Sequence, residues 1–262
     1  MNFLESILLG IIQGITEFLP ISSSGHLLIG RNIFNISSNM SGSFIEIFLH
    51  GGTLLSILFY WKKDLLNKYK ELKSGDYKFT LSLIIGTLPA ALVGLFFKDY
   101  INNYFYNLDN LQYLSSAYFL LSIILFSTRI KINRNLSILT YRIAIIIGLA
   151  QCLAILPGIS RSGITIAVAI FLGINNKAAV NFSFLLAIPI LVFTFFGSIF
   201  ENSSLFFNSE IFWQLIAGFI ASFIFGYISI SLLVKLTQKN RFWYFSIYTL
   251  LLSILLGLYN GI

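Results

Sequence analysis

The sequence is poor in charged residues. Only 10% of its 262 residues are Asp, Glu, Lys or Arg, and 57% are hydrophobic. A soluble globular domain carries roughly 25% charged residues, so this scarcity excludes a chain that faces water along most of its length. Apolar stretches of about 20 residues, enough to cross a hydrocarbon core of about 30 Å, recur throughout. The composition therefore predicts an all-α integral membrane protein.

Cysteine and acidic residues are also scarce. The single cysteine, Cys152, lies within an apolar segment and cannot form an internal disulfide. Seventeen Lys and Arg against ten Asp and Glu give a net charge of +7. These cations stand in short runs between apolar segments, which is typical of membrane-protein loops rather than of nucleic-acid binding. The opening MNFLESILLG contains no Lys or Arg, so we expect it to belong to the mature protein.

Six uninterrupted apolar segments predict membrane spans, at 44–61, 79–97, 111–128, 178–200, 211–234 and 242–259. The cations between them mark the cytoplasmic side. We expect four connections there: 62–78, 129–142, the neighbourhood of Lys177, and 235–241. The connections that are poor in cations are expected outside: 31–43, 98–110 and 201–210.

Two further apolar segments, 3–30 and 143–174, are interrupted by proline, glycine and serine. A single crossing by 143–174 would place Lys177 outside and reverse the charge bias of every later loop. We therefore expect a re-entrant hairpin that enters and leaves on the cytoplasmic side, and an equivalent first hairpin that enters from outside. Broken backbone at membrane depth is tolerated inside protein or beside a water-filled cavity.

The two broken segments match each other when one is shifted by 138 positions. The matching positions are Gly10 with Gly148, Gln13 with Gln151, and Ile21-Ser22-x-Ser24-Gly25 with Ile159-Ser160-x-Ser162-Gly163. Each half then contains one re-entrant helical hairpin and three transmembrane helices, and three crossings invert the second half. The sequence predicts one polytopic membrane domain over 1–262, an inverted-topology repeat with halves of about 1–128 and 141–262. Chance similarity between small-residue turns is the alternative.

The first hairpin carries the motif Gln13-x-x-x-Glu17-Phe-Leu-Pro-Ile-Ser-Ser-Ser-Gly-His26. Gln13 and Glu17 share one helix face. A carboxylate at membrane depth costs about 2.5–3.5 kcal/mol, so Glu17 should face a cavity and have a partner. Its oxygens suit a hard cation such as Mg²⁺, and His26 can act as acid, base or nucleophile. A packed polar turn, with Glu17 protonated or paired, is the alternative.

The second hairpin carries Pro157-Gly-Ile-Ser-Arg161-Ser-Gly-x-Thr165. Arg161 does not readily lose its proton and therefore needs an anion, and its planar fork matches phosphate oxygens. The glycines let backbone amides approach, and a helix N-terminus after the turn would add its positive end. A structural ion pair with Glu17 is the alternative, because the two tips should meet near the midplane. Together the motifs indicate phosphoryl chemistry.

The first motif resembles the first signature of the undecaprenyl-diphosphatase (bacitracin-resistance) family, and the second motif resembles its second signature. The segments 86–91 and 183–189 also fit, so the resemblance covers nearly the whole chain. It implies hydrolysis of undecaprenyl diphosphate to undecaprenyl phosphate and inorganic phosphate. This reaction recycles the lipid carrier for peptidoglycan synthesis and confers bacitracin resistance. It further implies a multi-pass protein of the bacterial plasma (inner) membrane whose active site opens to the outer face.

The resemblance also implies roles for individual residues. The catalytic group would contain Glu17, Ser23, His26 and Arg161, and the substrate-binding group Ser22, Ser160, Ser162 and Thr165. A divalent metal, Mg²⁺ or Ca²⁺, would be held by Glu17, with neutral Gln13 as a less favoured ligand. The nucleophile stays open among Ser23, His26 and water. The expected partners are the polyprenyl diphosphate and the bilayer, with no nucleic acid, and a homodimer stays open.

His50 stands where we expect glutamine in the family. We expect a packed or hydrogen-bonded polar residue there, with contact to the site as the less favoured alternative. Glu46, on the same span, is a candidate second partner of the site. Two other functions compete with hydrolysis: a transporter, such as a flippase for the carrier lipid or an anion permease, and a non-catalytic scaffold in a cell-wall complex. The combination of His, Arg and carboxylate favours hydrolysis.

Overall fold

A computed structural model gives the fold of residues 3–34, 40–105, 111–130, 136, 140–201 and 209–259. Within these ranges the side chains of 40–47, 98, 99, 101–103, 111, 198, 201 and 209–211 are not described. The regular secondary structure of the described residues is helical, without a strand. The all-α prediction is confirmed.

The helices of the described residues in the first half are α1 (Phe3–Phe18), α2 (Ser23–Ile33), α3 (Met40–Tyr60), α4 (Lys62–Lys73), α5 (Lys78–Phe105) and α6 (Leu111–Ser127). Those of the described residues in the second half are α7 (Tyr141–Gln151), the 3₁₀ turn η1 (Cys152–Ile155), α8 (Arg161–Phe171), α9 (Asn176–Glu201), α11 (Ser209–Gln238), the 3₁₀ turn η2 (Phe242–Tyr244) and α12 (Phe245–Tyr259).

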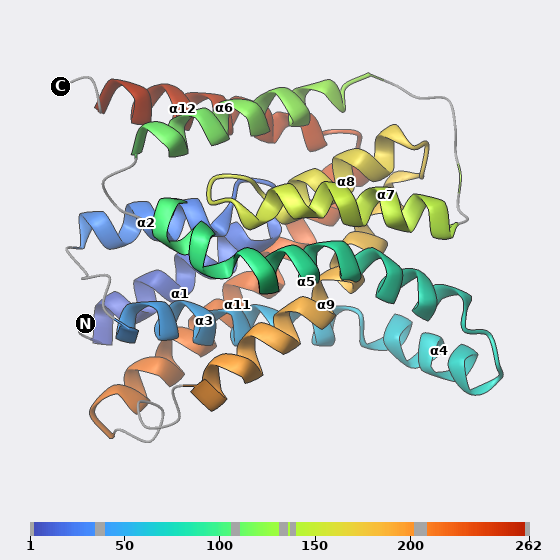
Figure 1. Ribbon diagram of the computed structural model, residues 1–262, viewed down its shortest axis with the longest axis horizontal. Coiled ribbons are helices and arrows are strands. Elements are labelled where there is room, and N and C mark those ends of the chain that lie inside the picture. The colour runs from blue at the N-terminus through green and yellow to red at the C-terminus, as the bar shows by residue number, and fades with distance from the viewer. Residues whose placement is uncertain are drawn as a thin grey trace.

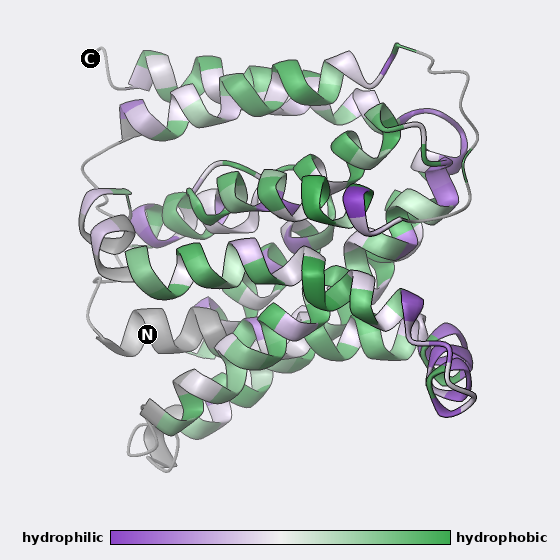
Figure 2. Ribbon diagram, turned by 45° about the vertical axis from the view of Figure 1, so that its right-hand side comes forward, coloured by the Kyte–Doolittle hydropathy of each residue, from purple (hydrophilic) through white to green (hydrophobic). Residues whose placement is uncertain are grey.

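Four segments within the described residues are long and apolar enough to cross a membrane: Lys78–Phe97, Asn176–Gly197, Phe212–Gln238 and Phe242–Tyr259. On α5, large apolar side chains are exposed at a helical spacing, among them Leu81, Ile84, Leu88 and Leu92. Such a face is stable in lipid rather than in water. Figure 2 shows green, hydrophobic residues along most of the helices. The protein is therefore an all-α, multi-pass integral membrane protein.

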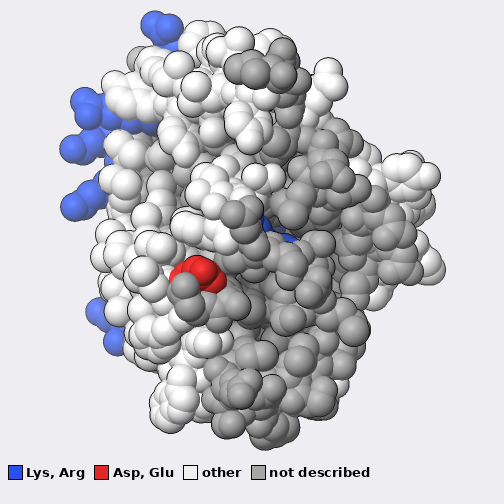
Figure 3. Space-filling model, turned by 90° about the vertical axis from the view of Figure 1, so that its left-hand side faces the viewer, with Lys and Arg blue, Asp and Glu red and all other residues white. Residues whose placement is uncertain are grey.

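Two helical hairpins enter the bundle from opposite ends (Figure 1). The open end of the α1–α2 hairpin lies at the left of the view, and that of the α7–α8 hairpin lies at the right. The cation-rich connections predicted on one side also gather at the right, where α4, the end of α6, the start of α7 and the end of α11 are found. Figure 3 looks onto the opposite end. Its described part is white apart from one red acidic group, some blue at the left margin and a little blue in a central hollow.

Close helix packing fixes both hairpins in the bundle. A Cβ added at Gly10 of α1 would lie 2.3 Å from the Gly218 carbonyl oxygen of α11. A Cβ added at Gly148 of α7 would lie 2.3 Å from the Gly86 carbonyl oxygen of α5. Only glycine allows helices this close. The first helix of each hairpin, α1 or α7, thus packs on a long helix from the other half of the chain.

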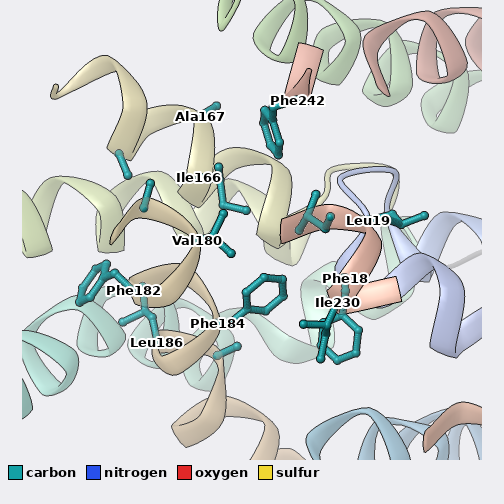
Figure 4. Close-up of a cluster of buried hydrophobic side chains, with 14 of the residues drawn as sticks. Phe18, Leu19, Ile166, Ala167, Val180, Phe182, Phe184, Leu186, Ile230 and Phe242 are labelled. Atoms are coloured by element: carbon teal, nitrogen blue, oxygen red, sulfur yellow. The ribbon is translucent and has the colours of Figure 1, made fainter. Parts of the chain in front are cut away.

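The core lies beneath the first hairpin tip. Figure 4 shows Phe18, Leu19 and Ile230 of α11 at the right of the cluster, and the ring of Phe184 of α9 between them and the residues at the left. The rings of Phe18 and Phe184 meet edge to face, with centroids 5.4 Å apart. The residue that follows Glu17 is therefore anchored in the core, which fixes where the carboxylate can reach.

One prediction was too simple. The connection 62–78, expected as a loop, contains α4 over Lys62–Lys73. Its charges suit the helix dipole, with Asp64 in the first turn and Lys70 and Lys73 in the last. Lys68 and Glu71 form an ion pair of 2.8 Å one turn apart. The segment is polar and mostly exposed, so it forms a surface helix and not a span.

Helices α6 and α12 form a pair along the upper edge of Figure 1. Two reciprocal hydrogen bonds join them: the Ser115 Oγ donates to the Ser253 carbonyl oxygen, and the Ser253 Oγ donates to the Ser115 carbonyl oxygen, each at 2.8 Å. The two serines stand 138 residues apart. This is the same offset that relates the two hairpins in the sequence.

Candidate active site

At each hairpin tip a serine caps the N-terminus of the second helix in the same way. Ser22 caps α2 and accepts from the Gly25 N–H at 3.4 Å, and Ser160 caps α8 and accepts from the Gly163 N–H at 3.1 Å. A serine hydroxyl is a favoured N-cap because it satisfies one of the free amides of the first turn. Ser22 takes a left-handed backbone, with φ 66°, a conformation that costs energy away from glycine and occurs often at functional sites.

The first residues of the two capped helices are Ser23 and Arg161, and both bind the carboxylate of Glu17. The Ser23 Oγ donates to Glu17 Oε2 at 2.6 Å, and the Arg161 Nη2 donates to Glu17 Oε1. Glu17 is only 8% exposed. The two helix N-termini therefore bring their positive ends to one buried carboxylate. The ion pair of Glu17 with Arg161, which the sequence offered as the alternative to a substrate-binding Arg161, is present in the structure.

Two more side chains complete the surroundings of Glu17. The Gln13 Nε2 donates to Glu17 Oε2 at 3.1 Å, one helical turn away. The His50 Nε2 of α3 lies 3.6 Å from the same oxygen. His50 therefore touches the site, which was the less favoured expectation. The side chain of Glu46 lies outside the described residues.

His26 is separated from this cluster. Its Nδ1 lies 2.8 Å from the Ser22 carbonyl oxygen and 2.9 Å from the Tyr118 hydroxyl, and its Nε2 lies 2.7 Å from the Tyr248 hydroxyl. Within the described part of the chain, these bonds do not include Ser23 or Glu17. The hydroxyl of Ser23 thus has the Glu17 carboxylate, and not His26, as its partner.

The remaining predicted binding residues hold the second tip together. The Oγ atoms of Ser160 and Ser162 lie 3.1 Å apart, and Ser162 also donates to the Leu19 carbonyl oxygen at 3.4 Å. The Thr165 hydroxyl donates to the Arg161 carbonyl oxygen at 2.8 Å and lies 2.6 Å from the Ser183 Oγ of α9. In this arrangement Thr165 links α8 to α9, and Ser162 links the two tips.

The predicted metal ligands offer oxygen atoms. The Gln13 Oε1 is buried and has no hydrogen-bond partner among the described residues, and the Glu17 carboxylate lies beside the Gln13 amide. Among the described residues no three His, Cys, Asp or Glu side chains gather around one point. A hard cation that keeps several waters fits such a donor set, whereas a cation that needs four protein ligands does not.

A cavity of about 220 Å³ lies away from these residues, between the α3–α4 junction, the start of α9 and the end of α11. The Trp61 indole N–H donates to Asn181 Oδ1 at 2.9 Å in its wall. The cavity includes none of the predicted site residues. At the predicted site the Arg161 guanidinium is bound to the Glu17 carboxylate.

Fold and site define a class: a polytopic membrane protein in which two opposed hairpin tips join a carboxylate, a serine and an arginine. The family model described as "Bacitracin resistance protein BacA" matches residues 6–255. The chain is 37% identical to "Undecaprenyl-diphosphatase 3" of Bacillus cereus, over 98% of this chain and 96% of that protein. It is 40% identical to "Undecaprenyl-diphosphatase" of Thermosipho africanus, over 96% of this chain and 98% of that protein. The chain belongs to the bacitracin resistance protein BacA family.

Proposed function

We propose that this protein hydrolyses undecaprenyl diphosphate to undecaprenyl phosphate and inorganic phosphate, and so returns the lipid carrier to peptidoglycan synthesis and confers bacitracin resistance. The observation that carries the proposal is the convergence on Glu17. Ser23 and Arg161, from two different hairpins, bind the two oxygens of one buried carboxylate. This set combines a hydroxyl, a base and a bidentate phosphate-binding group. Relatives of this chain are undecaprenyl-diphosphatases by name.

The hydrogen bond of 2.6 Å from Ser23 to Glu17 favours Ser23 as the nucleophile. Glu17 takes the hydroxyl proton while the Ser23 Oγ attacks the terminal phosphorus and the anhydride P–O bond breaks. The proton passes to the leaving lipid phosphate, and Arg161 moves from Glu17 to the oxygens of the transferred phosphoryl group. Water, deprotonated by Glu17, then attacks the phosphorus of the phosphoserine, the bond from phosphorus to the Ser23 Oγ breaks, and Glu17 returns the proton to the Ser23 Oγ. Direct attack by water, with Glu17 as base, and attack by His26 are the competing routes.

We infer that a divalent cation is held by Glu17 and Gln13. The support is the buried Gln13 Oε1 without a hydrogen-bond partner and the adjacent carboxylate. Bound Mg²⁺ or Ca²⁺ would neutralise charge on the diphosphate. Ser22, Ser160, Ser162 and Thr165 are proposed to orient the substrate by keeping both tips in place.

We also propose the inverted-topology repeat, with halves of about 1–128 and 141–262. It is supported by the matching serine caps of α2 and α8 and by the reciprocal hydrogen bonds of Ser115 and Ser253. The gathering of cation-rich connections at one end supports a plasma-membrane orientation with that end in the cytoplasm and the site open to the other side. A homodimer stays a prediction, which the mass of the detergent-purified protein tests.

The experiment is phosphate release from undecaprenyl diphosphate by the purified protein in detergent. Glu17→Gln should reduce turnover by about 10²–10⁴-fold, the range for loss of a general base. Ser23→Ala should reduce it comparably, and Ser116→Ala, on the exposed face of α6, is the matched control. Wild-type turnover by Ser23→Ala would assign the attack to water or His26. If the protein moves the lipid from one leaflet of a vesicle membrane to the other without releasing phosphate, it is a transporter and not a hydrolase.

A further inference from the structure

His26 is enclosed by two tyrosines from the α6–α12 pair. Tyr118 of α6 is fully buried, and its ring meets the imidazole edge to face, with centroids 5.8 Å apart. Tyr248 of α12 stacks on the imidazole, with centroids 5.7 Å apart and planes inclined by 13°. A Cβ at Gly25 would lie 2.4 Å from the Tyr118 hydroxyl oxygen. The glycine that precedes His26 therefore makes room for this tyrosine.

The contacts of Nδ1 determine where the proton of a neutral His26 sits. The Ser22 carbonyl oxygen, 2.8 Å from Nδ1, can only accept a hydrogen bond. An unprotonated Nδ1 would place two lone pairs against each other at that distance, so Nδ1 carries the proton. The Tyr118 hydroxyl then donates to the same carbonyl at 3.4 Å, and its oxygen offers Nδ1–H a second acceptor at 2.9 Å.

The protonation of Nδ1 determines the role of the other ring nitrogen, Nε2. With the proton on Nδ1, Nε2 of the neutral ring holds a lone pair and accepts from the Tyr248 hydroxyl at 2.7 Å. Tyr248 is 44% exposed, so its hydroxyl can be displaced without opening the core. Nε2 is thus the nitrogen that a reacting group can reach, and a protein group bonded to the other nitrogen fixes its role.

We propose that Tyr118 and Tyr248 are positioning residues that hold His26 as the Nδ1–H tautomer, so that Nε2 is the atom through which His26 exchanges a proton during turnover. The part that concerns proton exchange rests on the proposed hydrolysis, whereas the tautomer of His26 does not depend on the activity. His26 then serves the reaction from the α12 side, and Glu17 serves it from the Ser23 side.

The test uses ¹⁵N-histidine-labelled full-length protein in lipid bilayers at alkaline pH, where an imidazole is neutral. The chain has two histidines, and a His50→Gln spectrum assigns the signals. The expected wild-type spectrum shows a protonated Nδ1 and an unprotonated Nε2. Tyr248→Phe should shift the Nε2 resonance, and Tyr118→Phe should shift that of Nδ1. Tyr259→Phe, 67% exposed on α12, is the matched control and should shift neither.

Kinetics provide the second readout. Each Phe variant keeps its ring and loses one hydroxyl, with the two hydrogen bonds of Tyr118 or the one of Tyr248 that hold His26. We therefore expect kcat to fall by about 3- to 10-fold while KM changes little. A wild-type His26 that carries its proton on Nε2 overturns the proposal, as do Phe variants with unchanged spectra and kcat. Absence of phosphate release by the wild-type protein would instead overturn the proposed function, because the spectra read the tautomer whatever the activity.

Discussion

Arg161→Lys separates the ion pair that Arg161 forms in the structure from its proposed role in phosphate binding. In the structure the guanidinium binds the Glu17 carboxylate, and the Arg161 side chain is 18% exposed while that of Glu17 is 5% exposed. Lysine keeps the positive charge, and its flexible side chain should still bring an ammonium to the carboxylate. It loses the planar fork that binds two phosphate oxygens at once.

The size of the effect follows from what each substitution removes. Arg161→Lys removes one preorganised donor to the transferring phosphoryl group, which is worth about 2.7–4 kcal/mol, or 10²–10³-fold in turnover. Arg161→Ala also leaves a buried carboxylate without its cation, and breaking a buried pair costs about 3–5 kcal/mol. The hydrogen bonds from Ser23 and Gln13 remain and offset part of that cost. The Lys variant should therefore lose activity but not folding, and the Ala variant should lose both.

The assay measures phosphate release by purified variants and the amount of each variant recovered from membranes. Arg142→Lys, exposed at the start of α7, is the matched control and should behave as the wild type. Hydrolysis by Arg161→Lys at the wild-type rate would refute the phosphate-binding role. If neither the Lys nor the Ala variant accumulates in the membrane, the ion pair with Glu17 is structural, and the reasoning from substrate recognition fails.

Two further predictions concern the metal and the topology. Activity should disappear with excess chelator and return with Mg²⁺ or Ca²⁺, since oxygen ligands suit hard cations; full activity in chelator would remove the metal from the mechanism. In a Cys152→Ser background, Tyr104→Cys, at a position 60% exposed near the end of α5, should react with an impermeant thiol reagent in intact cells. Lys70→Cys, on α4, should not react, and the opposite labelling would invert the orientation.

The meeting of the two tips could be predicted from the sequence, because two ionisable groups stood alone in apolar surroundings. A buried carboxylate and a buried guanidinium each need a partner, and pairing the two opposite charges offsets the free-energy cost of burying them. A helix N-terminus after the second turn was also predicted, and the structure has one at Arg161. The serine caps of Ser22 and Ser160 were not predicted, although Ser-x-x-Gly follows a proline-containing turn in both segments. The cost of burying the charges of Glu17 and Arg161 was therefore enough to predict that the two tips meet.

The tyrosine contacts to His26 could not be predicted in this way. Tyr118 and Tyr248 stand among apolar residues at ordinary helical spacing, where an aromatic side chain usually packs in a core or faces lipid. Their contacts with His26 depend on how α6 and α12 pack against the first tip, and the sequence pattern does not show this tertiary packing. His50 was weighed as a packed residue for the same reason. Helix α4 was missed because a run of lysines suggested only a loop.

The proposed repeat explains why the site lies where the two copies differ. At the shared offset of 138 residues, Ser23 corresponds to Arg161, and both begin a capped helix and bind the same carboxylate. Glu17 corresponds to Ile155, so the second copy does not supply a carboxylate at the equivalent position. A symmetric pair of carboxylates would repel each other, and a symmetric pair of arginines would lack a base. On the proposed repeat and the proposed mechanism, divergence at these positions converts a symmetric frame into a site with one base, one hydroxyl and one phosphate-binding cation.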